Sequence, residues 1–373
     1  ASWAKVGSDT DPYQLLPTMS FGDGWNASTK LLNQFVPNNL PNALLKPQFV
    51  TSLEFGVELK FINNRLGLDL TYYDSKATDQ IISIPVSAAS GYLTKNINAG
   101  EIDNKGVEVM LYITPVKTKD FTWDMTFNFA KNNNEVVELA EGVEQYVLGT
   151  YWSLQVMAIP GQPYGSLYGY DLARDPKGNI LNVDGLPQQG DLKILGNYQP
   201  DWIGGMKNDF RYKNISLGVL IDTRQGGELY SMTTTWGRYA GVLEETLIGR
   251  EGGIVGIGTK ELADGSFVAN DVVVTCEEYN KAAYQNSIAY ASVFDASYIK
   301  LREVTFGYTF PKLGNLPIRN LSVSFVGRNL MLLMAKAPHI DPETSFDNTN
   351  VQGLEFGQLP SARSLGFNIS VNF

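Results

Sequence analysis

The sequence predicts an all-β protein, an antiparallel transmembrane β-barrel with short periplasmic turns and long extracellular loops. Three observations predict this fold: apolar and polar residues alternate along many segments, short and long connections alternate along the chain, and the last residue is Phe373. An alternation with a period of two is typical of a strand with two unlike faces. Bacterial outer-membrane barrels combine such strands with short turns at one end and long loops at the other.

The C-terminal segment shows the alternation most clearly, because Leu365, Phe367, Ile369 and Val371 are separated by polar residues or glycine. The strands expected on this basis are residues 1–6, 53–61, 66–72, 107–113, 121–129, 201–211, 215–221, 297–310, 320–330 and 364–373. A further hairpin, 151–159 with 166–172, would raise the number of strands from about 10 to about 12. Residues near 277–290 are a helical candidate.

The connections between these strands alternate in length. Short links fall at 62–64, 116–120, 212–214 and 311–319, and long links at 7–48, 77–104, 133–200, 225–296 and 331–362. A β-sandwich has no reason to place every long loop at one end, whereas a membrane barrel does. A soluble two-sheet protein remains the alternative, because the signal of each single strand is weak.

The composition excludes several classes of protein. No stretch approaches the ~20 consecutive apolar residues of a membrane-spanning helix. An aromatic content of 12% argues against disorder and fits the aromatic girdles of barrels. The net charge of −10 argues against a nucleic-acid partner, because phosphate affinity requires clustered Lys and Arg. One cysteine, Cys276, excludes a disulfide scaffold, and one histidine, His339, argues against a histidine-based metal site.

No catalytic, cofactor or metal-binding motif is convincing, so we expect neither an enzyme nor a bound cofactor. Ser297 and Lys300 have S-x-x-K spacing, but they lie in an expected strand, and the motif needs a helix to place the lysine beside the serine. Residues 175–179 fit a tight turn better than a cation site. We expect His339 to be a loop surface residue and Cys276 to be a free, small side chain.

Ligand contact is the one binding role that the residues suggest. Tyr230, Trp236, Arg238 and Tyr239 lie early in the longest expected outer loop, where no strand face explains their aromatic character. Aromatic faces with a planar donor suit stacking on sugar rings or gripping peptides. The same residues could instead pack within the loop, cover the mouth of the barrel or meet a partner lipoprotein.

Several sequence segments spread over nearly the whole chain resemble the C-terminal portion of the SusC/RagA-type TonB-linked outer-membrane proteins of Bacteroidetes. They are Ala1–Tyr13, Leu68–Ile81, Asn98–Val109, Gly161–Asp171, Gly196–Gly205, Ala296–Pro311, Val326–Leu330 and Leu359–Phe373. They stand in the order found in the family. The terminal Phe373 likewise resembles the C-terminal assembly signal of outer-membrane barrels.

The resemblance implies an importer of nutrients across the outer membrane, driven by TonB. It also implies a SusD-like lipoprotein partner, an oligosaccharide or peptide-like substrate, and a ~22-stranded barrel with a plugged lumen in contact with outer-membrane lipid. The family's plug, TonB-contacting segment and first strands are absent here. Ala1 begins within an expected strand, without an initiator Met or signal peptide.

Residues 1–373 are therefore expected to be the C-terminal part of the barrel of a longer chain. Such a piece has two exposed edges that lipid cannot satisfy, so we expect it neither to close a barrel nor to transport alone. Its partners would be the plug and N-terminal strands, and TonB acting through them. A passive porin and a soluble carbohydrate-binding β protein are the alternatives.

Overall fold

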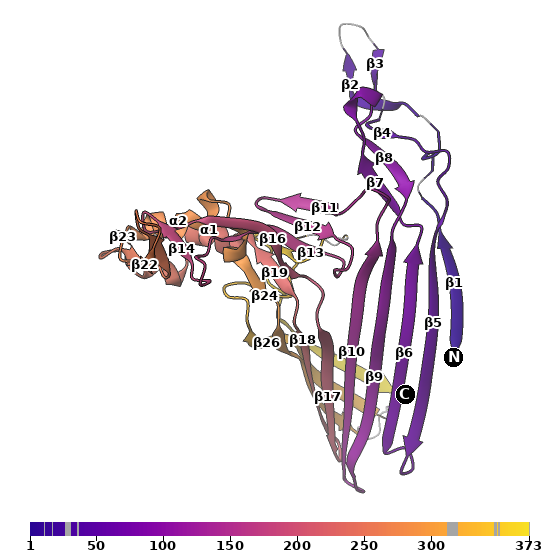
Figure 1. The fold of residues 1–373 in the computed structure, drawn as a ribbon. Helices are drawn as coiled ribbons and strands as arrows, with labels where there is room; N and C mark the ends of the chain where they lie inside the picture. Colours follow the sequence, from indigo (N-terminus) through magenta and orange to yellow (C-terminus); the bar gives the residue numbers. More distant parts are fainter. Residues whose placement is uncertain are drawn as a thin grey trace.

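A computed structural model of the chain describes residues 1–10, 12–16, 18–26, 31–35, 37–311, 320–346, 349 and 351–372. Its largest feature is a curved antiparallel sheet of ten strands (Figure 1). In spatial order they are β1 (Ser2–Ser8), β5 (Gln48–Phe61), β6 (Leu66–Thr78), β9 (Glu101–Lys117), β10 (Phe121–Glu138), β17 (Trp202–Tyr212), β18 (Ile215–Gln225), β25 (Tyr298–Phe310), β26 (Asn320–Ala335) and β28 (Ser364–Asn372). The ten expected strands and the barrel-type sheet are thus confirmed.

The sheet is open in this structure. Among the described residues, β1 pairs within it only with β5, and β28 pairs only with β26. Each of the other eight strands pairs with one strand on either side. The order of the ten strands in the sheet is the same as their order along the chain. This meander arrangement places the short turns at 62–65, 118–120 and 213–214 at one end of the sheet and the long connections at the other. The expected turn at 311–319 lies outside the described residues except for Pro311.

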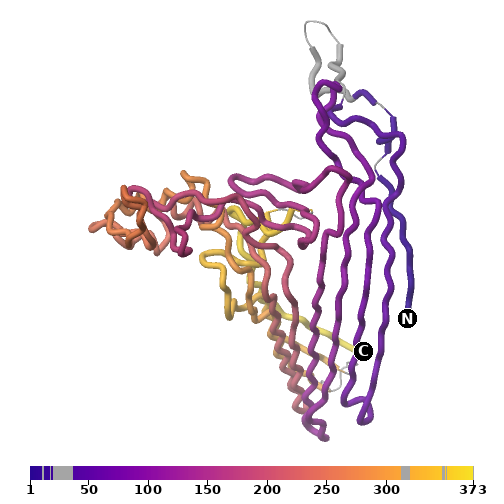
Figure 2. Tube along the Cα trace, in the orientation of Figure 1, coloured from indigo at the N-terminus to yellow at the C-terminus, as the bar shows by residue number. Residues whose placement is uncertain are grey.

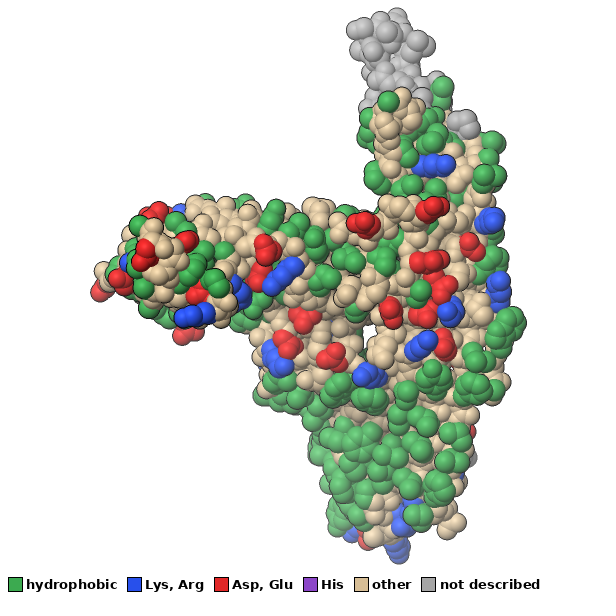
Figure 3. Space-filling view, viewed as in Figure 1, with side chains coloured by type: hydrophobic (Ala, Val, Ile, Leu, Met, Phe, Trp, Pro, Cys, Tyr) green, Lys and Arg blue, Asp and Glu red, His purple; other side chains and the backbone are tan. Residues whose placement is uncertain are grey.

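One face of the sheet carries a continuous apolar row. Trp123 pairs in register with Phe210, which pairs with Leu217. The same row continues through Phe306, Phe325 and Phe367 to the edge of the sheet. Figure 3 shows the apolar side chains gathered over the lower half of the strands, with charged side chains above them. This band is the surface that a barrel presents to the hydrocarbon of the membrane.

Several strands are longer than the membrane requires. β9 has 17 residues and β10 has 18, whereas a tilted strand crosses the hydrocarbon with about 9–11. The additional residues extend beyond the apolar band, where Lys76 pairs with Glu101 at 2.8 Å and Lys105 pairs with Asp74 at 3.6 Å. The sequence prediction ended these strands too early because their outer ends are polar and no longer alternate with apolar residues.

The long connections fold into a structure of their own, the outer lobe, which we define as residues 139–201 and 226–297. Figures 1 and 2 show the outer lobe extending sideways from the upper end of the sheet. Its elements are β11 (Tyr146–Tyr151), β12 (Leu154–Ala158), β13 (Ser166–Leu172), β14 (Leu181–Val183), β15 (Leu186–Pro187), β16 (Gln189–Asn197), β19 (Glu228–Ser231), α1 (Met232–Ala240), η2 (Glu244–Leu247), β20 (Ile254–Val255), β21 (Thr259–Glu261), β22 (Phe267–Ala269), β23 (Val273–Val274), α2 (Cys276–Gln285), η3 (Ala289–Ser292) and β24 (Val293–Asp295).

The expected hairpin of residues 151–159 and 166–172 exists as the antiparallel pair β12–β13, but it lies in a separate sheet of order β11-β12-β13-β16. The count of twelve barrel strands is therefore wrong. The physical reason is length and burial: β12 has 5 residues and β13 has 7, most of them buried. Strands this short cannot cross the hydrocarbon, and they form part of a globular core instead.

That core lies in the connections and not in the barrel wall. Nine buried residues pack together, from both parts of the outer lobe and from the segment that follows β26: Leu154, Val156, Leu167, Tyr198, Tyr230, Met232, Ala289, Val351 and Leu354. Leu354 belongs to β27 (Leu354–Glu355), which pairs in parallel with β19. The chain after β26 therefore completes a core that begins about 200 residues earlier.

The connections near the N-terminal edge form a second extension above β1, β5 and β6 (Figure 1). It comprises β2 (Ser20–Asn26), β3 (Leu31–Phe35), β4 (Asn39–Leu40), β7 (Ile81–Pro85), η1 (Ala88–Ser90) and β8 (Thr94–Asn98). The helical candidate near 277–290 is confirmed as α2, which starts with a capping box between Thr275 and Glu278. None of the helices among the described residues is long and apolar enough to span a bilayer.

Candidate functional site

Three of the four residues predicted to contact ligand line one pocket of the outer lobe. Trp236, Arg238 and Tyr239 face a space of about 870 Å³ between α1 and α2. The remaining lining residues are Ala240, Gly241, Thr246, Arg250, Thr275, Cys276, Glu277, Asn280 and Lys281. We call this space the α1–α2 pocket.

Local sequence explains how α1 presents these side chains. Ser231 caps its N-terminus by accepting a hydrogen bond from the Thr234 backbone N–H at 3.1 Å. Gly241 ends the helix with a φ of 68°, a left-handed conformation that glycine adopts without strain. Within the helix, Trp236 and Tyr239 are three residues apart and therefore share a face.

On that face the two rings pack against Tyr284 of α2. The ring centroids are 5.4 Å apart for Trp236 and Tyr239, 4.8 Å for Trp236 and Tyr284, and 5.3 Å for Tyr239 and Tyr284. Lys281 lies over the Tyr239 ring at 4.9 Å. Packing within the loop thus accounts for part of the aromatic character, yet Trp236 keeps 37% of its surface exposed.

Arg238 is held by a chain of charged contacts. Its Nε donates to Glu245 Oε1 at 2.5 Å, and its Nη1 donates to the Ala291 carbonyl at 2.6 Å. Glu245 Oε2 also contacts His339 Nε2 at 2.9 Å. Burial alone would raise the pKa of the Glu245 carboxyl, but the hydrogen bonds from His339 and Arg238 outweigh it and hold the pKa below its ordinary value.

Tyr230, the fourth predicted residue, is placed in the core and not in the pocket. It is 2% exposed, and its hydroxyl is 3.1 Å from Ser153 Oγ. Burial raises the pKa of the Tyr230 hydroxyl. Packing within the loop, one of the alternatives considered from the sequence, therefore accounts for Tyr230. The predicted assembly signal Phe373 lies outside the described residues.

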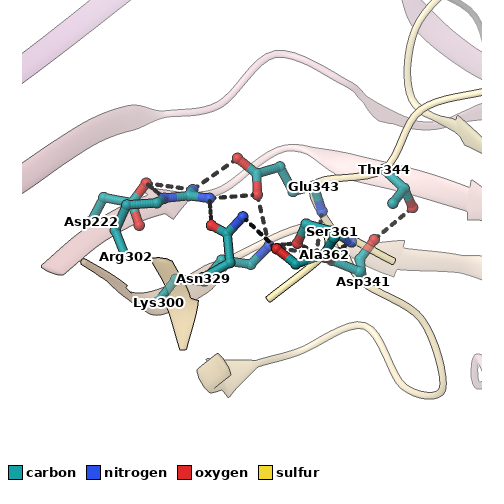
Figure 4. Close-up of polar contacts among 9 residues, drawn as sticks. All are labelled: Asp222, Lys300, Arg302, Asn329, Asp341, Glu343, Thr344, Ser361 and Ala362. Atoms are coloured by element: carbon teal, nitrogen blue, oxygen red, sulfur yellow. Dashed lines mark hydrogen bonds and ion pairs between the residues drawn. The ribbon is translucent and has the colours of Figure 1, made fainter. Parts of the chain in front are cut away.

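A second site, a buried ionic network, lies where the sheet wall meets residues 336–363, which we call the C-terminal loop (Figure 4). Lys300 of β25 is 4% exposed. Its Nζ donates to Asp341 Oδ1 and Glu343 Oε2, each at 2.7 Å, and to Ser361 Oγ at 3.1 Å. Asp341 also accepts hydrogen bonds from the backbone N–H and the hydroxyl of Ser361.

Arg302, two residues further along β25, extends the network toward β18. Its Nη1 and Nη2 donate to the two oxygens of Glu343 at 3.0 and 2.8 Å. Its Nε and Nη2 donate to Asp222 Oδ2 at 2.9 and 2.6 Å. Asn329 of β26 accepts from Arg302 at 2.8 Å and donates to the Ala362 carbonyl at 3.1 Å. Two cations of the wall thus hold two carboxylates of the C-terminal loop.

The titration behaviour of the loop carboxylates follows from these contacts. Burial would raise the pKa of Asp341, but the hydrogen bonds from Lys300 and Ser361 prevail and lower it to about 2. Burial likewise opposes the ionised form of Glu343, and hydrogen bonds from Arg302 and Lys300 hold its pKa below the ordinary value. Both carboxylates are therefore charged at neutral pH.

The C-terminal loop also contacts α1 directly. Glu355 accepts hydrogen bonds from Ser231 Oγ and Thr233 Oγ1, each at 2.6 Å. His339 of the same loop contacts Glu245, the partner of Arg238. The C-terminal loop therefore connects the ionic network on the sheet wall to the helix that lines the α1–α2 pocket.

This network was not predicted from the sequence, in which Lys300 drew attention only for its S-x-x-K spacing from Ser297. The Ser297 hydroxyl instead bonds Asp295 and the Gly226 backbone N–H, while Lys300 bonds the C-terminal loop. An available signal was the presence of two cations, two residues apart, in a strand that is otherwise largely apolar. Asp341 and Glu343 have the same spacing in the loop that follows.

Other candidates from the sequence have structural explanations. Asp175 accepts hydrogen bonds from the Lys177 and Asn179 backbone N–H groups, as in a tight turn, and a further one from the Thr259 hydroxyl of β21. Cys276 is buried and free, and its Sγ lies 3.1 Å from the Thr246 carbonyl. His339 is in the C-terminal loop, paired with Glu245 as described above. Across the described part of the chain, no group of His, Cys, Asp and Glu side chains is arranged to hold a metal ion.

The curved meander, its apolar band and its long loops define an outer-membrane β-barrel of the receptor and transporter class. Residues 9–330 match the family model described as "TonB dependent receptor-like, beta-barrel", and the chain belongs to that family. The family consists of receptors and transporters of the outer membrane, which are not enzymes.

Curated relatives match the whole chain or part of it. The TonB-dependent receptor P3 of Formosa agariphila is 27% identical over 100% of this chain and 39% of its own length. The TonB-dependent receptor SusC of Bacteroides thetaiotaomicron is 26% identical over 51% of this chain and 20% of its own length. The chain spans about two fifths of the length of the P3 receptor.

Solved structures share the fold. The structure of the RagAB peptide transporter superimposes with a TM-score of 0.73 at 19% identity, over 100% of this chain and 40% of that one. The RagAB peptide importer in the "open-open" state gives a TM-score of 0.74 at 18% identity, over 100% of this chain and 39% of that one. At this level of identity the likeness concerns the fold.

Proposed function

We propose that residues 1–373 form the C-terminal part of the barrel of a TonB-dependent importer that acts on oligosaccharides or peptide-like nutrients with a SusD-like surface lipoprotein. The observation that carries the proposal is the family match over residues 9–330, together with a barrel wall whose apolar band suits lipid. The likeness to SusC and to the RagAB peptide transporter supports a cargo of this kind and a two-component assembly.

The parts of the chain would have different roles in such an importer. The ten-stranded sheet forms part of the wall, and the outer lobe and C-terminal loop stand above it where a cargo arrives. Energy from TonB would enter through a plug domain supplied by the rest of the transporter. The two outer strands, β1 and β28, are the edges that further strands would complete, because open edges are not stable in lipid.

Uptake by the complete transporter tests this proposal. The full-length protein and its lipoprotein are expressed in an outer membrane, and accumulation of labelled maltoheptaose, of labelled trigalacturonate and of a labelled peptide mixture is followed with and without TonB. Accumulation of at least one cargo that depends on TonB is the expected result. Accumulation that persists unchanged without TonB would identify a passive porin, and no binding or uptake of either class would contradict the proposal.

A further inference from the structure

Arg250, at the rim of the α1–α2 pocket, is a cation held in place without a carboxylate partner. Its Nη2 donates to the Gly241 carbonyl at 2.5 Å and contacts Thr246 Oγ1 at 3.3 Å, and its Nε donates to the Thr246 carbonyl at 2.9 Å. Among the described residues, no carboxylate lies within ion-pair distance of its guanidinium. The contacts to neutral oxygens fix the side chain but leave its charge uncompensated.

The other two cations of the pocket are neutralised. Arg238 pairs with Glu245 at 2.5 Å, and Lys281 pairs with Glu277 at 2.5 Å. The net positive charge of the pocket therefore comes from Arg250.

A flat apolar surface lies in the same pocket. The Trp236 ring is 37% exposed and is supported from behind by Tyr239 and Tyr284. A supported indole is a rigid platform for the C–H face of a sugar ring. On the opposite wall the Thr275 hydroxyl is engaged with Glu278, and the Asn280 Nδ2 donates to the Cys276 carbonyl at 2.8 Å. The Asn280 Oδ1 can accept a hydrogen bond from a ring hydroxyl.

We propose that the α1–α2 pocket binds an acidic saccharide, with the sugar ring on Trp236 and its carboxylate or sulfate group on Arg250. The Arg250 Nε and Nη2 are occupied by Thr246 and Gly241, and Nη1 is the nitrogen that can donate to either anion in a charge-assisted hydrogen bond. This inference rests on the proposed function, because it names the chemical class of the cargo.

The structure favours a saccharide over an acidic peptide. All lining residues belong to α1, α2, η2 and the turns that follow or precede them, and no strand lines the pocket. An extended peptide is usually held by main-chain hydrogen bonds to a free strand edge. The pocket offers side-chain groups and a ring face instead.

Binding is tested with the complete transporter and its lipoprotein by isothermal titration. The probes are trigalacturonate, its methyl ester, galactose 6-sulfate, galactotriose and triglutamate. We expect trigalacturonate or galactose 6-sulfate to bind about tenfold or more tightly than its uncharged counterpart, and Arg250→Gln to remove that preference. Arg250→Lys, which keeps the charge but loses the guanidinium contacts to Gly241 and Thr246 that fix its position, should retain part of it.

The control variant is Lys177→Gln, because Lys177 is an exposed cation of the same lobe that lies outside the pocket. It should leave the preference unchanged. Equal affinity for the acidic and uncharged sugars, or a preference that survives Arg250→Gln, would overturn the inference. Arg250-dependent binding of triglutamate alone would assign the pocket to peptides. If any of these results overturned the inference, TonB-dependent uptake of neutral maltoheptaose would still support the proposed function. Failure of the inference can therefore be told apart from failure of the proposed function.

Discussion

The indole Nε1 of Trp123 donates a hydrogen bond to Asn208 Oδ1 at 3.1 Å, across the pairing of β10 with β17. Asn208 lies between Met206 and Phe210 on the apolar face of β17, the face that a barrel turns toward lipid. In hydrocarbon neither the indole N–H nor the amide oxygen finds water, so each satisfies the other. A polar residue in the lipid-facing row is thereby accommodated by a tryptophan on the neighbouring strand.

Removing one partner should therefore destabilise the barrel more than removing both. We expect Asn208→Leu in the complete transporter to lower the free energy of unfolding by about 1–3 kcal/mol, because the indole N–H loses its acceptor. Adding Trp123→Phe should recover part of that loss. Urea unfolding in lipid vesicles measures both variants, and strictly additive effects would show that the two side chains are not coupled.

The buried Lys300 should be required for the attachment of the C-terminal loop. Lys300→Met leaves Asp341 and Glu343 without one cation, and a buried pair broken on one side costs about 3–5 kcal/mol. We expect faster protease cleavage and faster amide exchange within residues 336–363. Lys336→Met is the matched control, because its pair with Asp295 is half exposed and such pairs contribute about 0–1 kcal/mol.

Acid should release the same loop. The folded-state pKa of Asp341 is about 2, below the ordinary value of 3.8, so its contribution is present above pH 4 and is lost as the pH falls toward 2. Amide exchange of residues 336–363 should therefore rise between pH 4 and pH 2. Asp341→Asn should give a loop that is loosened already at pH 5 and whose response over this window is weaker. An unchanged acid response in that variant would assign the effect to another group.

Trp236 should contribute to ligand affinity without being needed for the fold. We expect Trp236→Ala to weaken cargo binding by the complete transporter about tenfold, since a stacked aromatic platform is worth on the order of 1 kcal/mol or more. Trp152→Ala is the control: Trp152 is 41% exposed and packs on Phe356 at 4.7 Å, outside the α1–α2 pocket. Equal loss in both variants would indicate general damage to the outer lobe.

The barrel wall was predictable because the alternation of apolar and polar residues can be recognised within each single strand. Alternation at Leu365 to Val371 and in the other nine segments reports directly which face of a strand meets lipid, and the lengths of connections report which end faces outward. The strand ends beyond the apolar band were not predictable in this way, because polar residues occur on both faces there: Lys76 and Lys105 lie on one face, and Ser75 and Asn104 lie on the other.

The site was predictable only in part for a related reason. Trp236 and Tyr239 stand out in a loop as aromatic residues without a strand to explain them, and both do line the α1–α2 pocket. Tyr230 has the same appearance in the sequence but is buried, because β27 pairs with β19 from more than 100 residues away. Arg250 is inconspicuous until the structure shows which carboxylates are absent from its surroundings.

The position of the C-terminal loop has a consequence for biosynthesis. Lys300 and Arg302 are made about 40 residues before Asp341 and Glu343, and Ser231 is made 124 residues before Glu355. The contacts between the outer lobe and the C-terminal loop therefore cannot form until residues 336–355 have been synthesised. A chain cut short before Asp341 would leave Lys300 and Arg302 without these two carboxylates and the outer lobe without Glu355.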